Sequence, residues 1–461
     1  MNQFLNPVFL LRIAKSYLSE VNRIWKYDYD KLVAYQNKAF RNIVQFAYNN
    51  VPVYHKKYKE NGIHPNEINT ISDIQKLPII TKNDFRKAYP SKLISTKAKE
   101  NQYFIVSTSG STGKPVFLYH DRLATIRSLE AFVRVLKAYG GNWNKTKIIL
   151  IIDLEPGSIE STLFASTISP FLKKFIPMSN IKYLHFGRNP DDLINEINEF
   201  QPEFLGSDPN MLRKLAFLKL YGKGSNISPK YVFSSGAMLD IYTKRYIEKA
   251  FSARTIDMYG TTEAGPLAFE CIEGGYYHVH SDFIYLEALD KQNIPVSPGN
   301  QGKVILTKLF GSATPIIRYN GLGDLITPIE INSSCGICSQ IIKDIQGRIT
   351  DLIILPNGRQ LSPFIITGIP AKVMEHFNSY KIQQFQIIQQ DCNTIEVLVV
   401  IDEHLRNVGT PVNIILHELQ KRFSERINQN ISIHVKEVDA IQKDKRLDYV
   451  QVVVSKVKHE M

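Results

Sequence analysis

The sequence predicts an α/β fold with a large N-terminal region of several subdomains and a small, mobile α+β domain at the C-terminus. Strand patterns alternate with helix patterns between residues 103 and 260, short strand patterns with Gly/Pro turns follow to residue 319, and a second strand–helix set begins after residue 347. The alternation predicts mostly parallel sheets covered on both faces, and the short strands predict a β-rich subdomain.

Length and composition are those of an ordinary globular protein with two or three domains. The chain has 461 residues, of which 44% are hydrophobic and 22% are charged. A net charge of +12 favours anionic partners such as nucleotides. No compact Lys/Arg block and no nucleic-acid motif is evident, so nucleic acid is not an expected partner.

The first twenty residues predict an amphipathic helix rather than a signal peptide, because Arg12 and Lys15 follow the short apolar run and no small-residue cleavage site comes after it. No stretch of about 20 apolar residues predicts a spanning helix. We therefore expect a cytoplasmic protein, and the N-terminal helix is suited to peripheral contact with a membrane surface. The oligomeric state is not readable from the sequence.

The elements follow in order along the chain. Helix patterns cover residues 28–58, and Thr81 is expected to cap a further helix. Strands are expected near 103–107, 116–121, 147–153, 181–186, 203–207, 230–236 and 253–260, with helices at 123–139, 190–200, 210–220 and 239–251 between them. Short strands are expected at 276–289, 302–309 and 314–319. We divide the chain into residues 1–346 and 347–461, with a flexible joint at 347–351.

A loop rich in Gly, Ser and Thr separates the first two of these strands. Its residues are Ser107, Thr108, Ser109, Gly110, Ser111, Thr112, Gly113 and Lys114. Glycines let the backbone approach a ligand closely, and successive N–H groups and hydroxyls can surround phosphate oxygens. Pro115 follows the lysine where a Walker A loop needs Ser or Thr, so a kinase-type P-loop is disfavoured. The alternative interpretation is a flexible surface loop.

Three further segments carry chemistry. The run Asp257–Gly265 (DMYGTTEAG) follows a strand directly, so its Glu263 can hold Mg²⁺ beside a phosphate loop, and Tyr259 offers a flat face for a base. In RYNGLGD, Asp324 can accept hydrogen bonds from both ribose hydroxyls. GRITD lies at the joint. Each segment alone is equally consistent with an ordinary turn.

Taken together and in this order, the four motifs resemble the adenylate-forming superfamily of acyl-CoA synthetases. The resemblance is to its phenylacetate–CoA ligase-like branch, which includes proteins associated with capsular polysaccharide synthesis. It covers nearly the whole chain, including the opening stretch VPVYHKKYKENGI…LPIITKNDF. It implies that residues 1–346 form the adenylating domain, which binds nucleotide and acid, and that residues 347–461 form the domain that moves.

The resemblance also implies roles for individual residues. The loop from Ser107 to Lys114 would hold the ATP phosphates, Tyr259 would stack on adenine, Thr262 would contact phosphate, and Glu263 would bind Mg²⁺. Further nucleotide-binding residues would be Ser235, Gly236, Ala237, Gly260, Thr261, Asp324 and Arg348.

The hinge position and the catalytic lysine depart from the family pattern. The hinge falls on Thr350, where an acidic or basic residue is usual. The catalytic lysine that bridges carboxylate and α-phosphate matches Lys445, with Lys443 as second choice. Asp444 stands where relatives have Gly. The alternative interpretation of this segment is a solvated run of charges.

The cysteines predict a structural zinc rather than a disulfide framework. Cys271, His278, Cys335 and Cys338 would form a Cys₃His site, with His280 as the substitute for His278. The alternative is a set of buried thiols without metal. Cys392 is expected to pack in the core.

Three functions compete. The first is ATP-dependent activation of a carboxylic acid to an acyl-adenylate, followed by transfer to a thiol of coenzyme A or a carrier protein. The second transfers the acyl group to an amine in polysaccharide or natural-product assembly. The third is a non-catalytic nucleotide-binding homologue. The acid itself is not readable, and aryl acids are a family-level expectation.

Overall fold

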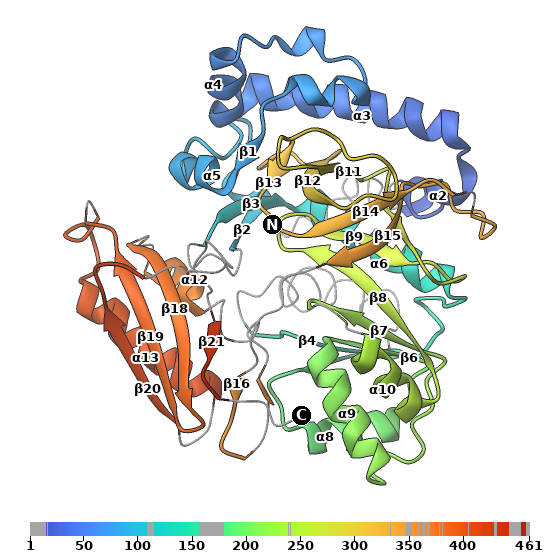
Figure 1. Cartoon of the computed structure of the whole chain (residues 1–461), viewed down its shortest axis with the longest axis vertical. Helices are drawn as coiled ribbons and strands as arrows, with labels where there is room; N and C mark the ends of the chain where they lie inside the picture. Colours follow the sequence, from blue (N-terminus) through green and yellow to red (C-terminus); the bar gives the residue numbers. More distant parts are fainter. Residues whose placement is uncertain are drawn as a thin grey trace. The chain divides into compact units, whose positions relative to one another are not determined.

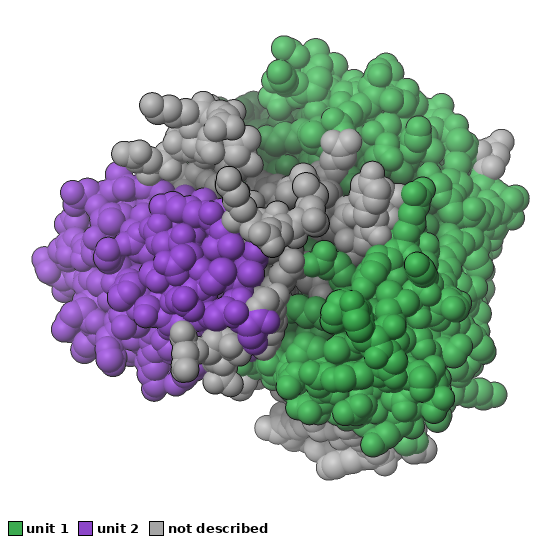
Figure 2. All heavy atoms as spheres, turned by 60° about the horizontal axis from the view of Figure 1, so that its bottom comes forward, with its two compact units in different colours: residues 1–106, 118–348 green, residues 107–117, 349–461 purple. Residues whose placement is uncertain are grey.

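The computed structural model describes residues 15, 17–107, 115–155, 179–237, 239, 241–331, 333–346, 353–357, 360–361, 366, 369–377, 379, 381–403, 405–427, 431–441 and 453–457. They belong to two compact units, Met1–Val106 with Leu118–Arg348 and Ser107–Phe117 with Ile349–Met461 (Figure 2). Within the described part of the chain, no helix combines the length and hydropathy needed to cross a bilayer. The predicted roles of the two parts, nucleotide binding and movement, stay predictions.

Helices open the first unit (Figure 1). They are α2 (Arg23–Lys26), α3 (Tyr29–Asn50), α4 (Pro52–Glu60) and α5 (Lys82–Ala88), with 3₁₀ turns at Pro65–Glu67, Ile71–Lys76 and Glu100–Gln102. Thr81 caps α5 as predicted: its hydroxyl accepts from the Asp84 amide, and the Asp84 carboxylate accepts from the Thr81 amide. This reciprocal cap holds the start of α5, and with it Lys82, in one orientation.

The predicted strand–helix alternation is confirmed. The strands are β4 (Ile148–Ile152), β5 (Ile181–His185), β6 (Phe204–Ser207), β7 (Tyr231–Ser235) and β8 (Arg254–Thr261), and the helices are α6 (Arg122–Ala138), α8 (Pro190–Phe200), α9 (Pro209–Leu220) and α10 (Ile241–Phe251). These five strands pair in parallel in the order β5-β4-β6-β7-β8. Their carboxyl ends therefore meet at one edge of the sheet.

Both faces of this parallel region are covered. Phe204 and Phe233 pack with Leu136 of α6 in one buried cluster. Leu205 and Val232 point to the other face because side chains alternate along a strand, and they are also fully buried. Helices α9 and α10 lie side by side next to β6 and β7 in Figure 1.

The predicted β-rich subdomain is present, and it continues the parallel sheet through hydrogen bonds. It contains β9 (Gly265–Glu270), β10 (Tyr277–Val279), β11 (Ile284–Leu289), β12 (Gly302–Lys308), β13 (Tyr319–Asn320), β14 (Leu325–Ile329) and β15 (Ile341–Gln346). Strand β9 turns back antiparallel on β8, and this turn joins the two halves of a 13-stranded sheet. Strand β1 (Ile80–Thr81) pairs with β13, while β2 (Tyr103–Ser107) and β3 (Phe117–Asp121) form a separate pair.

The second unit is α+β, as predicted. Its sheet has the order β20-β19-β18-β21, from β18 (Ile382–Asp391), β19 (Thr394–Ile401), β20 (Ser432–Glu437) and β21 (Val453–Ser455), and α12 (Ile369–His376) and α13 (Val412–Ile427) accompany it. A small pair, β16 (Ile353–Ile354) and β17 (Gln360–Leu361), stands apart. Cys392 lies half-buried in the β18–β19 turn, so its predicted place in the core is wrong: a two-residue turn points away from the packed faces.

Candidate active site

Tyr259 and Asp324, two of the predicted nucleotide-binding residues, meet in the folded chain. The Tyr259 hydroxyl, on β8, donates a hydrogen bond of 2.7 Å to Oδ2 of Asp324, which stands 65 positions later, between β13 and β14. Burial and the Asp324 charge raise the pKa of Tyr259, so the hydroxyl stays protonated. A tyrosine ring and a carboxylate thus lie together at the carboxyl end of β8, where α/β sheets bind ligands.

Glu263 is buried in the turn between β8 and β9. Only 5% of its surface is exposed, and its Oε1 accepts a hydrogen bond of 3.4 Å from the Tyr319 hydroxyl. Burial raises the pKa of Glu263, the Lys82 charge opposes that rise, and the Asp324 charge adds to it. Both carboxylates offer oxygen atoms, the ligands that a divalent cation favours.

The backbone of the β8–β9 turn fixes the position of Glu263. Gly265 has φ +76°, and a Cβ there would lie 2.6 Å from Oγ of Ser128 on α6. Only glycine meets both conditions. The Ala264 amide donates to the Thr261 hydroxyl at 3.3 Å, which closes the turn around Glu263.

The end of β7 lies beside these residues. Ser235 pairs in register with Met258, which precedes Tyr259, and Gly236 follows with φ +86°. No described atom lies within 4 Å of a Cβ built on Gly236, so its backbone angle, rather than crowding, requires glycine. Ser235 and Ala237 are half-buried at this edge.

Several predicted site residues lie outside the described residues: Thr108, Ser109, Gly110, Ser111, Thr112, Gly113, Lys114, Arg348, Thr350, Lys443 and Lys445. Ser107 ends β2 and is half-buried. The phosphate loop, the hinge and the catalytic lysine therefore stay predictions.

Two neighbours of Glu263 were missed from the sequence. Tyr319 stacks on Phe85 of α5 at 5.0 Å and 14° between rings, and Lys82 starts the same helix. The parallel pairing of β1 with β13 brings α5 to this place. The Thr81–Asp84 capping box was the one sequence signal near Lys82. It predicts where α5 begins, but not which residues that end of the helix contacts.

Arg318 of the RYNGLGD motif has a structural task. Its guanidinium pairs with Glu287 at 3.2 Å and donates to the carbonyl oxygens of Gln75 and Leu77. It adopts φ +50°, which is uncommon for a residue with a side chain. These contacts hold the segment before β1 against the RYNGLGD motif.

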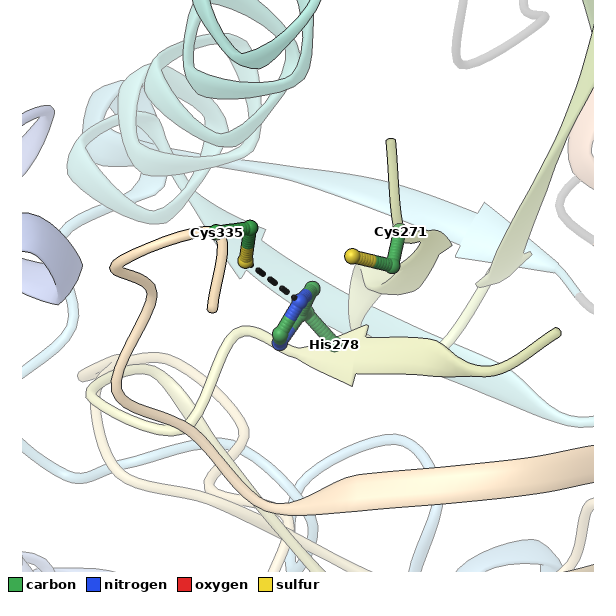
Figure 3. A group of neighbouring side chains, drawn as sticks. All are labelled: Cys271, His278 and Cys335. Atoms are coloured by element: carbon green, nitrogen blue, oxygen red, sulfur yellow. Dashed lines mark hydrogen bonds between the residues drawn. The ribbon is translucent and has the colours of Figure 1, made fainter. Parts of the chain in front are cut away.

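A second site gathers three of the four predicted zinc ligands (Figure 3). The ligand atoms of Cys271, His278 and Cys335 all lie within 4.8 Å of one another, and Cys335 Sγ is 3.2 Å from His278 Nε2. The other ring nitrogen of His278 lies 2.8 Å from the Ser339 hydroxyl, which orients Nε2 toward the sulfurs. Burial lowers the pKa of His278 to about 4, so the ring is a neutral imidazole, the form that binds metals.

The fourth predicted ligand does not join this group. The Cys338 amide donates to the Ile24 carbonyl at 2.8 Å, and its thiol is outside the cluster. His280, the substitute for His278, instead places Nδ1 3.3 Å from the Arg134 guanidinium. The backbone hydrogen bond to α2 holds Cys338, and spacing in the sequence could not reveal that contact.

Comparison with curated proteins places the chain among known relatives. No family model matches it. It is 26% identical to the phenylacetate-coenzyme A ligase of Aromatoleum evansii over 92% of this chain and 94% of that protein, and 25% identical to Protein CapK of Staphylococcus aureus over 93% and 90%. The phenylacetate-coenzyme A ligase of Escherichia coli K12 is 28% identical over 63% of this chain and 66% of that protein.

The chain is similar over most of its length to phenylacetate-coenzyme A ligases, in agreement with the resemblance that its four motifs predict.

Solved structures agree with this adenylate-forming fold. A 2-hydroxyisobutyryl-CoA ligase in complex with 2-HIB-AMP and CoA has a TM-score of 0.63 at 18% identity, covering 93% of this chain and 90% of that one. The same ligase in an open conformation gives 0.58 over 91% and 90%. The predicted fold class is confirmed.

Asp257 gives the stability of the protein a testable pH dependence. Burial raises its pKa to about 6, against the opposing effect of the Tyr277 hydroxyl, which donates at 2.8 Å. Because the native state favours the protonated form, this group makes folding less favourable as pH rises from about 4 to 6, by up to about 3 kcal/mol. We expect Asp257→Asn to equal wild type in urea unfolding at pH 4 and to exceed it at pH 7. A difference that does not vary with pH would contradict this.

Proposed function

We propose that this chain activates a carboxylic acid with ATP to an acyl-adenylate and passes the acyl group to the thiol of coenzyme A. It is an AMP-forming ligase. The observation that carries the proposal is the meeting of Tyr259, Asp324 and buried Glu263 at the carboxyl end of β8. Relatives named as coenzyme A ligases and a structural neighbour that holds an acyl-AMP with CoA support it.

In the first half-reaction, a carboxylate oxygen of the acid attacks the α-phosphorus of ATP, the bond to the bridging oxygen breaks, and pyrophosphate leaves. The Tyr259 ring and the Asp324 carboxylate would hold the nucleoside, and Glu263 would hold Mg²⁺. The ion would supply positive charge to the phosphates when bound. Side chains form no bond to substrate here, so alignment and charge compensation dominate the rate.

In the second half-reaction, the thiol sulfur attacks the acyl carbon, its proton is released, and AMP leaves with the electrons of the acyl–oxygen bond. We include in this proposal a turn of the small domain about residues 347–351, which would exchange Lys445 for the acceptor. The amine acceptor lacks support, because the relatives that are named for an activity are coenzyme A ligases and the matching ligase structure holds CoA.

Pyrophosphate exchange tests the proposal. The full chain is incubated with Mg²⁺, ATP, labelled pyrophosphate and single acids, including phenylacetate and 2-hydroxyisobutyrate, and coenzyme A is then added to the active mixture. We expect acid-dependent exchange and an acyl-CoA detectable by mass spectrometry. Exchange without an acyl-CoA would favour another acceptor, and no exchange with any acid would leave the non-catalytic homologue as the better reading.

We also propose that Cys271, His278 and Cys335 hold a structural Zn²⁺. Two thiols and a neutral, oriented imidazole are the donor set that zinc prefers, and zinc bound there would link the β9–β10 turn to the segment before β15. A structural site needs a fourth ligand. Cys338, three residues after Cys335, would have to turn inward to supply it.

Zinc content distinguishes these ligand sets. We expect about one zinc per chain in wild type, almost none in Cys335→Ser, and a lower unfolding temperature for that variant, because structural zinc contributes directly to folding. Cys392→Ser, in the β18–β19 turn of the second unit, is the matched control and should keep its zinc. Loss of zinc in Cys338→Ser would make it the fourth ligand, and retention would leave that position to water. Zinc-free wild type would reject the site.

A further inference from the structure

His120 lies near the end of β3, the strand that follows the predicted phosphate loop, and its side chain reaches the turn that contains Glu263. Its Nε2 lies 3.1 Å from the backbone carbonyl oxygen of Glu263, a residue 143 positions away. A carbonyl can only accept, so this nitrogen carries the hydrogen and donates. His120 has 8% of its surface exposed, so water does not readily replace the bond.

The strand holds His120 from both sides. The Tyr119 amide donates to the Thr314 hydroxyl at 3.1 Å, and the Thr314 amide donates to the Tyr119 carbonyl at 3.0 Å. On the other side, the Asp121 carboxylate accepts from the amide and the hydroxyl of Ser312. Neighbouring residues of a strand point to opposite faces, so anchoring Asp121 on one face directs His120 to the other.

Charged side chains lie near the buried ring. Burial and the nearby Lys308 charge lower the pKa of His120 to about 3, although Asp121 opposes this. Lys308 and Asp121 both lie close to Gly311: a Cβ built there would be 3.3 Å from Cε of Lys308 and 3.8 Å from Oδ2 of Asp121.

We propose that His120 is a positioning residue for the magnesium-binding carboxylate: its ring holds the Glu263 backbone and so aims the Glu263 side chain. This inference rests on the proposed function, in which Glu263 binds Mg²⁺. The inference links two motifs that are far apart in the sequence, because β3 follows the predicted phosphate loop and Glu263 follows β8.

The test measures the Mg²⁺ dependence of pyrophosphate exchange with the most active acid. His120→Leu removes the donor and strands a buried carbonyl, so the Mg²⁺ concentration for half-maximal exchange should rise about tenfold or more, with a smaller change in the rate at saturating Mg²⁺. His120→Gln places an amide donor at similar reach and should stay within about threefold of wild type. Its pH–rate profile should keep the wild-type shape, because His120 moves no proton.

Two outcomes would overturn the inference: unchanged Mg²⁺ dependence in His120→Leu, or equal defects in the Gln and Leu variants. If His120→Leu does not fold, His120→Asn takes its place, because its shorter amide falls short of the Glu263 carbonyl while staying polar. Glu263→Gln, measured in parallel, separates a failure of the proposed role of Glu263 from a failure of the proposed role of His120. Normal Mg²⁺ dependence in that variant would refute the proposed role of Glu263, whereas a defect there with a normal His120→Leu would refute the inference alone.

Discussion

Replacing Glu263 with glutamine is expected to lower pyrophosphate exchange by about 10²–10³-fold at a fixed Mg²⁺ concentration. Removing one preorganised charge-stabilising contact in a water-excluded site costs rates of this order. Glutamine has nearly the same shape and can still accept from the Tyr319 hydroxyl, so the fold should survive. The loss should be greatest at low Mg²⁺.

Nucleotide binding with and without Mg²⁺ completes the measurement. Wild type should bind ATP more tightly in Mg²⁺ than in EDTA, and the variant should lose most of that difference. Glu60→Gln, an exposed position in α4 whose only described ion pair is with Lys56, is the matched control and should behave as wild type. A variant that keeps the magnesium effect on affinity would remove Glu263 from the metal site.

Replacing Asp282 with alanine is expected to destabilise the protein by about 3–5 kcal/mol, the usual cost of breaking a buried ion pair by removing one partner. Asp282 is 1% exposed and accepts two hydrogen bonds, of 2.8 and 2.9 Å, from Arg134, which has no exposed surface. Arg23 of α2 adds a third at 3.0 Å. Burial alone would raise the pKa of Asp282, but the Arg134 charge and its hydrogen bonds lower it.

Without Asp282, the buried Arg134 guanidinium would lose this carboxylate partner, and Arg23 of α2 would keep only its pair with Glu20 among the described residues. Urea unfolding at pH 7 gives the free-energy change. Asp191→Ala breaks an exposed pair with Lys223 and should cost less than about 1 kcal/mol. If Asp282→Ala and Asp191→Ala lower the free energy of unfolding by similar amounts, the buried network of Asp282, Arg134 and Arg23 does not hold α2 in place.

Much of the fold was predictable because it depends on near neighbours in the chain. Apolar periodicity placed α6, α8, α9 and α10, and the Thr81–Asp84 pair marked the start of α5. The continuity of the β-rich half with the parallel sheet was not predictable, because it depends on how β9 turns back on β8.

The candidate site also contains residues that the sequence predicted and residues that it did not. Glycine-rich turns and a carboxylate after a strand made Tyr259, Glu263 and Asp324 candidates, and the order of the four motifs favoured them over ordinary turns. His120 and Lys82 carried no such signal, since an isolated histidine or lysine in a strand or helix has many roles. Their proximity to Glu263 depends on pairings such as that of β1 with β13.

The sequence by itself indicated the resemblance to phenylacetate–CoA ligases, the order of strands and helices, and which side chains are candidates for binding a nucleotide and zinc. Tertiary structure alone decided that the Tyr259 hydroxyl bonds Asp324, that His120 reaches the Glu263 backbone, and that Cys338 stays outside the cysteine–histidine cluster. Local propensity and turn chemistry act over a few residues. Contacts across 65 or 143 positions depend on strand register and packing, for which one sequence pattern allows many arrangements.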